Sequence, residues 1–81
     1  MAQVTLQRFV QELEKLRKEA DAAALTPQDY DSRLARIIRE LREQGLDADR
    51  AATTAALADA VKRGVITATV ELHLRHRLGL A

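Results

Sequence analysis

The sequence predicts an all-α protein: a small four-helix domain built as two helical hairpins, with no β-sheet. Three observations predict this. Apolar residues recur at helical spacing, each such stretch starts at a Thr or Asp able to cap a helix, and three stretches end at a glycine. The helices are expected at about residues 5–23, 27–44, 48–63 and 68–78 of one domain, 1–81.

The first helix is expected to begin at Thr5 and to carry one continuous apolar stripe. The members lie alternately three and four residues apart: Leu6, Phe9, Leu13, Leu16, Ala20 and Ala23. Such a stripe is typical of packing against the next helix of the same chain, or of a coiled-coil-like seam with a second chain. The spacing leaves both interpretations open, because three heptads are too few to separate them.

The stretch LTPQDY marks where one helix stops and the next begins. Thr26 suits the N-cap, Pro27 the first helical position and Asp29 the third position of a capping box. Leu25 and Tyr30 have the spacing of a hydrophobic staple across that cap. The stretch therefore predicts a tight turn between the first two helices.

The second helix should present one apolar face and one charged face. The apolar face comprises Tyr30, Leu34, Ile37, Ile38 and Leu41, and the charged face comprises Arg33, Arg36, Arg39, Glu40, Arg42 and Glu43. We expect the charged face to be solvated, with an acidic partner as the alternative. Gly45 is expected to end the helix in a left-handed conformation, with Leu46 folding back on Leu41 as in a Schellman motif.

The third and fourth helices are separated by Gly64. Asp47 or Asp49 caps the third helix, which is rich in alanine and has Leu57 and Val61 as its larger apolar residues. Thr67 caps the fourth helix, and Gly79 closes it. The β-branched segment 65–67 is not expected to form a strand, because no second strand is predicted to pair with it.

The composition favours a protein that binds another copy of itself or a different protein. Hydrophobic residues make up 47% of the chain, but fifteen residues are alanine, which buries little area. A small domain with so thin a core would gain from covering a further apolar face. The sequence therefore predicts a non-enzymatic interaction or adaptor module, a homodimer through its first helix. The expected interface residues are Leu6, Phe9, Leu13, Leu16, Leu78 and Leu80.

The alternative is a small DNA-binding regulator using residues 56–78. Ala60, Gly64, Val65 and Val70 have the spacing of a helix-turn-helix motif. The nucleic-acid contacts would be Thr67, Thr69, His73, Arg75 and Arg77. Three features count against this interpretation. Asp59 stands where the motif needs an apolar residue, and His73 stands at a position that the motif needs to be buried. The arginines come late in the helix.

The charge balance and the chemically reactive side chains exclude few classes of function, and they indicate no catalytic or metal-binding chemistry. The net charge is +1, with eight Lys/Arg and ten Asp/Glu in residues 1–49, and five against two in residues 50–81. This basic bias is weaker than that of typical nucleic-acid binders. With no cysteine, a lone Ser32 and no glycine-rich loop, we expect neither an enzyme nor a cofactor. His73 and His76 are i,i+3, but they lack a third ligand, so no metal is expected.

The start of the chain and its overall composition suggest its origin. MAQVTLQRF has neither a basic nor an apolar signal region, and no apolar run is long enough to span a bilayer, so we expect a cytoplasmic protein. Arginine outnumbers lysine ten to three, which with so much alanine indicates a GC-rich bacterial genome.

Residues 13–41 resemble short bacterial helical-hairpin modules of the SHOCT type. The resemblance is carried by Leu25-Thr26, Asp29, Tyr30 and Arg33, in the order apolar-Thr turn, acidic residue, aromatic residue and basic helix. Ala23-Ala24 stand where those modules have a glycine, and about a third of the chain is covered. The resemblance implies oligomerisation or tethering to another protein.

Overall fold

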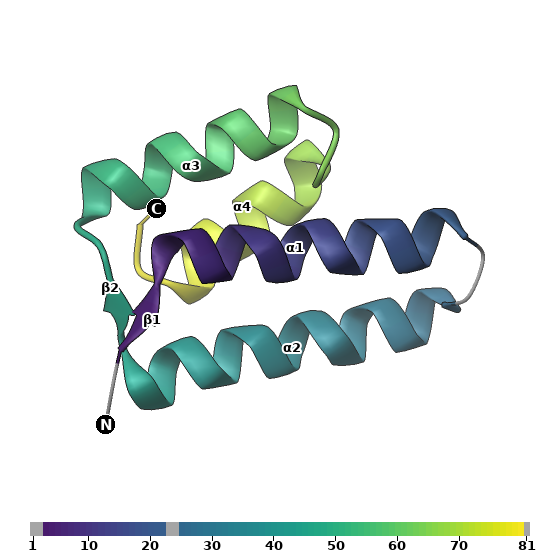
Figure 1. Cartoon of the computed structure of the whole chain (residues 1–81), viewed down its shortest axis with the longest axis horizontal. Coiled ribbons are helices and arrows are strands. Elements are labelled where there is room, and N and C mark those ends of the chain that lie inside the picture. The colour runs from purple at the N-terminus through teal and green to yellow at the C-terminus, as the bar shows by residue number, and fades with distance from the viewer. Residues whose placement is uncertain (1–2, 23–24, 81) are drawn as a thin grey trace.

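A computed structural model describes residues 3–22 and 25–80 of the chain. Its helices are α1 (Leu6–Asp21), α2 (Pro27–Gln44), α3 (Arg50–Lys62) and α4 (Ala68–Arg77) (Figure 1). α1 and α2 lie side by side as an antiparallel hairpin, and α3 and α4 form a second hairpin packed against it through α1. The prediction of a mainly helical protein with four helices is confirmed.

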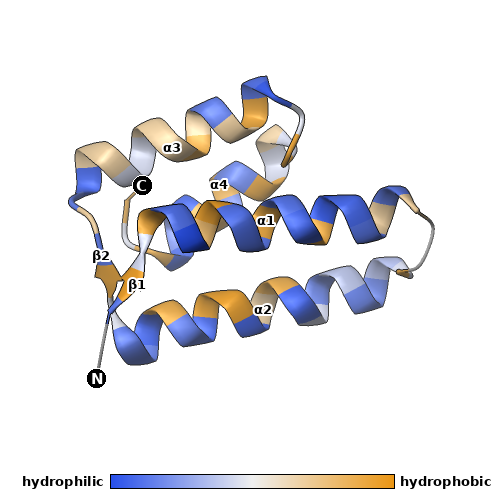
Figure 2. Cartoon of the chain, in the orientation of Figure 1, coloured by the Kyte–Doolittle hydropathy of each residue, from blue (hydrophilic) through white to orange (hydrophobic). Residues whose placement is uncertain are grey.

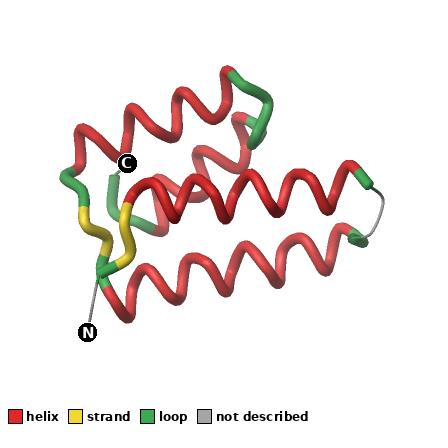
Figure 3. Tube along the Cα trace, viewed as in Figure 1, coloured by secondary structure: helices red, strands yellow, loops and turns green. Residues whose placement is uncertain are grey.

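The prediction that there is no β-sheet is wrong. β1 (Val4–Thr5) and β2 (Leu46–Asp47) form a two-stranded parallel sheet at one end of the first hairpin (Figure 3). Val4 pairs with Leu46, Thr5 pairs with Asp47, and the Val4 N–H donates to the Gly45 carbonyl at 2.9 Å. Two-residue strands show no alternation, and their partners are distant in sequence, so no local pattern predicts them.

Each helix begins at a residue that the sequence indicated as a cap. The side-chain oxygens of Thr5, Thr26, Asp49 and Thr67 accept from the backbone N–H groups of Arg8, Asp29, Ala52 and Val70 at 2.7–3.2 Å. Asp49 rather than Asp47 caps α3, because Asp47 is held in β2. These bonds satisfy backbone donors that have no partner within the helix.

The helix ends depart from the prediction at several places, and α3 and α4 each end one residue earlier than expected, at Lys62 and Arg77. α1 ends at Asp21 with Ala22 as its C-cap, and Ala23, where we expected the end, lies outside the described residues. Gly45 caps α2 with a φ of 82°, as expected, but its ψ of 152° sends the chain onward in an extended form. Leu46 therefore enters β2 instead of folding back as in a Schellman motif. The combination of φ and ψ at Gly45 is almost exclusive to glycine.

The core lies where the two hairpins meet. Its buried apolar members are Val4, Phe9, Leu13, Leu16, Leu34, Ile38, Leu41, Leu57, Ala60, Val65, Ile66 and Leu74. In Figure 2 the apolar residues of α1 and α2 form stripes, whereas most of α3 has the weaker hydropathy of alanine. Thr53 is the buried polar residue among those described, and its hydroxyl donates to the Asp49 carbonyl at 2.8 Å.

Candidate functional site

The apolar stripe of α1 is occupied by packing within the chain. Phe9 and Leu13 are 1% exposed and Leu16 is 3% exposed, all in the core shared with α2 and α3. Leu6, Leu78 and Leu80 are half-buried and pack against the same core. Of the two interpretations of the stripe, the structure has the intramolecular one, so a partner reaches Phe9, Leu13 and Leu16 only if the chain opens.

The turn between α3 and α4 has several features of a helix-turn-helix. Ala60 is fully buried, and Gly64 has a φ of 76°. Val65 is also buried, and the buried position along α4 is taken by Leu74 rather than His73. Asp59 lies on the surface, where its carboxylate accepts from the Arg63 Nε at 2.8 Å. An acid is tolerated there because it faces solvent.

The five candidate nucleic-acid contacts do not share one face of α4. Thr67 is the N-cap, while Thr69, His73 and Arg77 follow one another at four-residue spacing and face α2. Arg75 lies on another side of the helix, half-buried, with a buried Nε that has no hydrogen-bond partner among the described residues. The structure therefore brings three of these residues together and separates the other two from them.

An open groove of about 560 Å³ lies between α2 and α4, and it is the surface that sequence reasoning missed. It is lined by Asp31, Leu34, Ala35 and Ile38 of α2 and by Thr69, Val70, His73 and Arg77 of α4. We call this the α2–α4 groove. Buried Leu34 and Ile38, with half-buried Val70, give it an apolar floor. The signal in the sequence was Ala35, a small residue amid the charged face of the second helix.

A second hollow continues from the α2–α4 groove toward the chain terminus. Arg77 borders both, and the hollow, of about 440 Å³, is also lined by Leu41, Arg42, Leu46, Thr53, Leu78, Gly79 and Leu80. We call it the C-terminal hollow. Two of the predicted interface residues, Leu78 and Leu80, thus lie beside an open surface.

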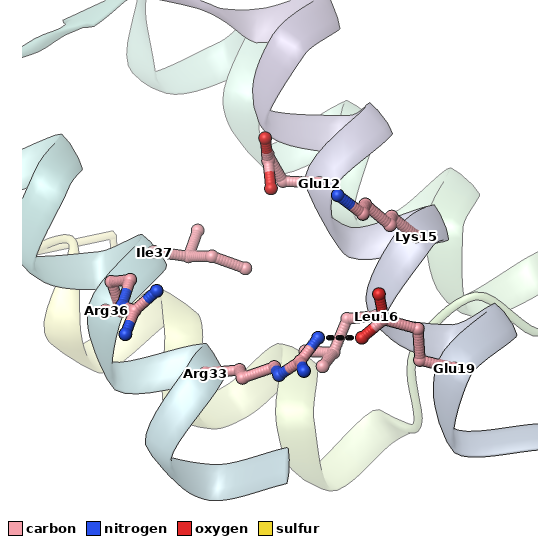
Figure 4. A pocket seen from close by; sticks show the side chains of 7 residues that line it. All are labelled: Glu12, Lys15, Leu16, Glu19, Arg33, Arg36 and Ile37. Carbon is pink, nitrogen blue, oxygen red and sulfur yellow. Dashed lines mark hydrogen bonds and ion pairs between the residues drawn. The ribbon is translucent and has the colours of Figure 1, made fainter. Parts of the chain in front are cut away.

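A third cleft, of about 350 Å³, runs between α1 and α2 and is strongly charged (Figure 4). Arg33 donates to the Glu19 carboxylate across it, and the remaining lining residues are Glu12, Lys15, Leu16, Arg36 and Ile37. Farther along the same pair of helices, Arg8 and Glu40 form an ion pair at 2.7 Å. Exposed ion pairs of this kind contribute little to stability.

Arg63, the C-cap residue of α3, joins the second hairpin to α1 of the first. Its guanidinium donates to the Glu14 carboxylate of α1 and to the Asp59 carboxylate of α3, both at 2.8 Å. These hydrogen bonds raise the pKa of Arg63 above its already high value. Nearby, the Arg17 Nε donates to the Val65 carbonyl at 3.3 Å, which ties α1 to the turn before α4.

Tyr30, at the start of α2, provides a test of burial in this region. Burial raises the pKa of its phenol, a nearby Arg17 lowers it, and Asp31 raises it further. Because the unfolded chain loses the phenolic proton first, near pH 10, the free energy of unfolding should fall as pH rises above about 10 and be unaffected by Tyr30 below about 9.

The Tyr30→Phe variant should lose that part of the alkaline destabilisation. Denaturant unfolding between pH 8 and about 11.5 would measure it for both proteins. Since Tyr30 is the chain's single tyrosine and there is no tryptophan, ultraviolet absorbance reports the titration of this phenol alone. An equally steep alkaline loss in the Tyr30→Phe variant would contradict the prediction.

The two histidines and the lone serine are all exposed. No three His, Asp or Glu side chains among the described residues come together as a metal site, and His76 is exposed beside His73 but does not line the groove. Ser32 is exposed on α2. Over the same residues, no helix combines the length and the apolar character needed to cross a bilayer.

Comparison with models of known protein families finds no match, and comparisons with curated proteins and with solved structures find none either. The likeness of residues 13–41 to SHOCT modules therefore rests on those residues alone.

Proposed function

We propose that this chain is a non-enzymatic protein-interaction module that self-associates through the α2–α4 groove. The observation that carries the proposal is an open groove with an apolar floor in a small protein whose core is thin. The groove runs beside α2 and α4, which are not among the closely packed helix pairs. Grooves of this kind accept a helix laid along their length.

Ala35 supports the proposal by its place and its size. It is exposed, and it lies on α2 between the turns that carry Asp31 and Ile38. A small side chain at this position lets the backbone of another helix approach closely. Leu78 and Leu80, in the adjoining C-terminal hollow, supply the accessory apolar contact.

Ala35→Arg is expected to abolish self-association while leaving the fold intact. The long charged side chain would fill the groove, and arginine is nearly as good a helix former as alanine. Sedimentation equilibrium up to about 1 mM chain would detect an association as weak as about −4 kcal/mol. The matched control is Ala55→Arg, the same change at an exposed site on α3 outside every groove described above, which should associate like the unmodified protein.

Two results would go against the proposal. One is an unmodified protein that remains monomeric at the highest concentration. The other is an Ala35→Arg variant that associates as strongly as Ala55→Arg.

A second candidate function is a small helix-turn-helix-like DNA-binding regulator using residues 56–78. It is favoured by the buried Ala60, the positive φ of Gly64 and the buried Leu74 at the α3–α4 turn. Its test is a salt titration with random duplex DNA. Binding that weakens steeply with salt, and that is lost when His73 and Arg77 are both changed to Ala, would favour it. Absence of binding at about 50 mM salt would exclude it.

A further inference from the structure

We infer that the occupant of the α2–α4 groove is a second copy of this chain, packed antiparallel about a twofold axis, with Asp31 of each copy facing Arg77 of the other. This inference rests on the proposed function and deepens it by naming the partner and its orientation. It is carried by the distribution of charge along the groove.

The two ends of the groove carry opposite charges. Asp31 lies on the second turn of α2, whereas Arg77 ends α4 and also borders the C-terminal hollow with Arg42. Arg42 does not line the groove, but it shares the C-terminal hollow with Arg77 and lies about 16 Å from Asp31 along the α2 axis at 1.5 Å per residue, so Arg77 is placed toward the opposite end of α2 from Asp31. The groove is thus acidic at one end and basic at the other, with its apolar floor between them.

These charges are not neutralised within the chain. Asp31, Arg42 and Arg77 are exposed, and the ion pairs found among residues 3–22 and 25–80 include none of the three. By contrast, Arg33 pairs with Glu19 on the side of α2 that faces α1. The charges bordering the groove therefore remain available to a partner.

A surface with this pattern is complementary to itself after a half-turn. A twofold axis beside Ala35, with α2 of each copy lying in the groove of the other, reverses the ends, so the acidic end of one copy meets the basic end of the other, and the same contact recurs by symmetry. The parallel arrangement would bring Asp31 of both copies together and is disfavoured by repulsion. Ala35, between the ends, permits close approach where the two α2 helices cross.

Other surfaces and partners fit less well. The cleft between α1 and α2 mixes both signs of charge along its length and has an internal ion pair between Arg33 and Glu19. A phosphate backbone in the α2–α4 groove would meet the Asp31 carboxylate at one end. A second copy supplies an acid and a base at the matching separation, together with the apolar strip between them.

Charge reversal tests the twofold pairing directly. Asp31→Arg alone and Arg77→Asp alone should each weaken self-association at least about tenfold, because each places two like-charged pairs in the homodimer. An equimolar mixture of the two single variants should form a 1:1 heterodimer with affinity near that of the unmodified protein, since both contacts are then opposite in charge. The double variant should recover self-association for the same reason.

The measurement is sedimentation equilibrium of each variant, with one partner labelled in the mixture, and circular dichroism to establish that each variant is folded. Glu43→Arg and Lys62→Asp serve as controls, since they make the same changes of charge at exposed sites outside the groove. Both controls should associate like the unmodified protein.

Three results would overturn the inference. They are single reversals that associate normally, a mixture that associates no better than its components, or controls that weaken association as much as the groove variants. If the unmodified protein dimerises and Ala35→Arg prevents it, while the mixture fails to associate, the twofold pairing fails and the proposed function stands. If the unmodified protein is monomeric, both fail.

Discussion

Phe9→Ala should destabilise the protein by about 3–5 kcal/mol, the usual cost of truncating a buried phenylalanine. Phe9 is 1% exposed and belongs to the group of largest fully buried side chains. The loss is large for this chain because a small domain has a total stability near the lower end of about 5–15 kcal/mol. The melting temperature should fall by more than about 12 °C.

Thermal and denaturant unfolding measure this effect, and Leu72→Ala is the control. Leu72 is 55% exposed and is the one large apolar side chain left exposed in the described part of the chain. Its truncation should change stability by less than about 0.5 kcal/mol. Similar losses for the two variants would show that Phe9 is not the centre of the core.

Leu74→Ala is expected to cost about 2–5 kcal/mol and to act mainly on the second hairpin. Leu74 is fully buried and is the only residue of α4 that is buried, so the attachment of this helix depends on it more than on any neighbour. Denaturant unfolding should show the loss of stability. Amide hydrogen exchange should show it first in residues 68–77, because local opening of α4 becomes easier.

His76→Ala provides the comparison on the same helix. His76 is exposed, and its replacement should leave both stability and exchange nearly unchanged. If α4 exchanged no faster in Leu74→Ala than in His76→Ala, its attachment would have to come from the half-buried Val70 and Leu78 instead. Because α4 forms one wall of the α2–α4 groove, Leu74→Ala should also weaken self-association.

The proposed dimer changes which residues matter for function. The predicted seam of Phe9, Leu13 and Leu16 becomes structural, because these side chains form the core of the single chain. The proposed contacts move to exposed residues of α2 and α4, of which His73 and Arg77 had been assigned to nucleic acid. The two proposed functions are thereby separable by experiment, since Asp31→Arg should impair self-association and would make the surface more attractive to DNA.

Local chemistry determined the positions of the helices. Thr5, Thr26 and Thr67 accept the predicted capping hydrogen bonds, and α2 has the predicted limits. Gly45 and Gly64 adopt positive φ where the helices end. These features were predictable because each depends on residues only a few positions apart, whose hydrogen bonds and backbone preferences are properties of the segment itself.

Tertiary structure alone decided what each helix faces. The stripe of α1 could cover another chain or α2, and that choice depends on how the whole core packs. The pairing of Val4 with Leu46, and the placing of Asp31 and Arg77 at the two ends of one groove, depend on segments more than forty residues apart. Such contacts depend on the path of the intervening chain, which no periodicity within a segment encodes. For this protein, local sequence specified the four helices and most of their limits, whereas packing decided which residue caps α3 and which surface was left open.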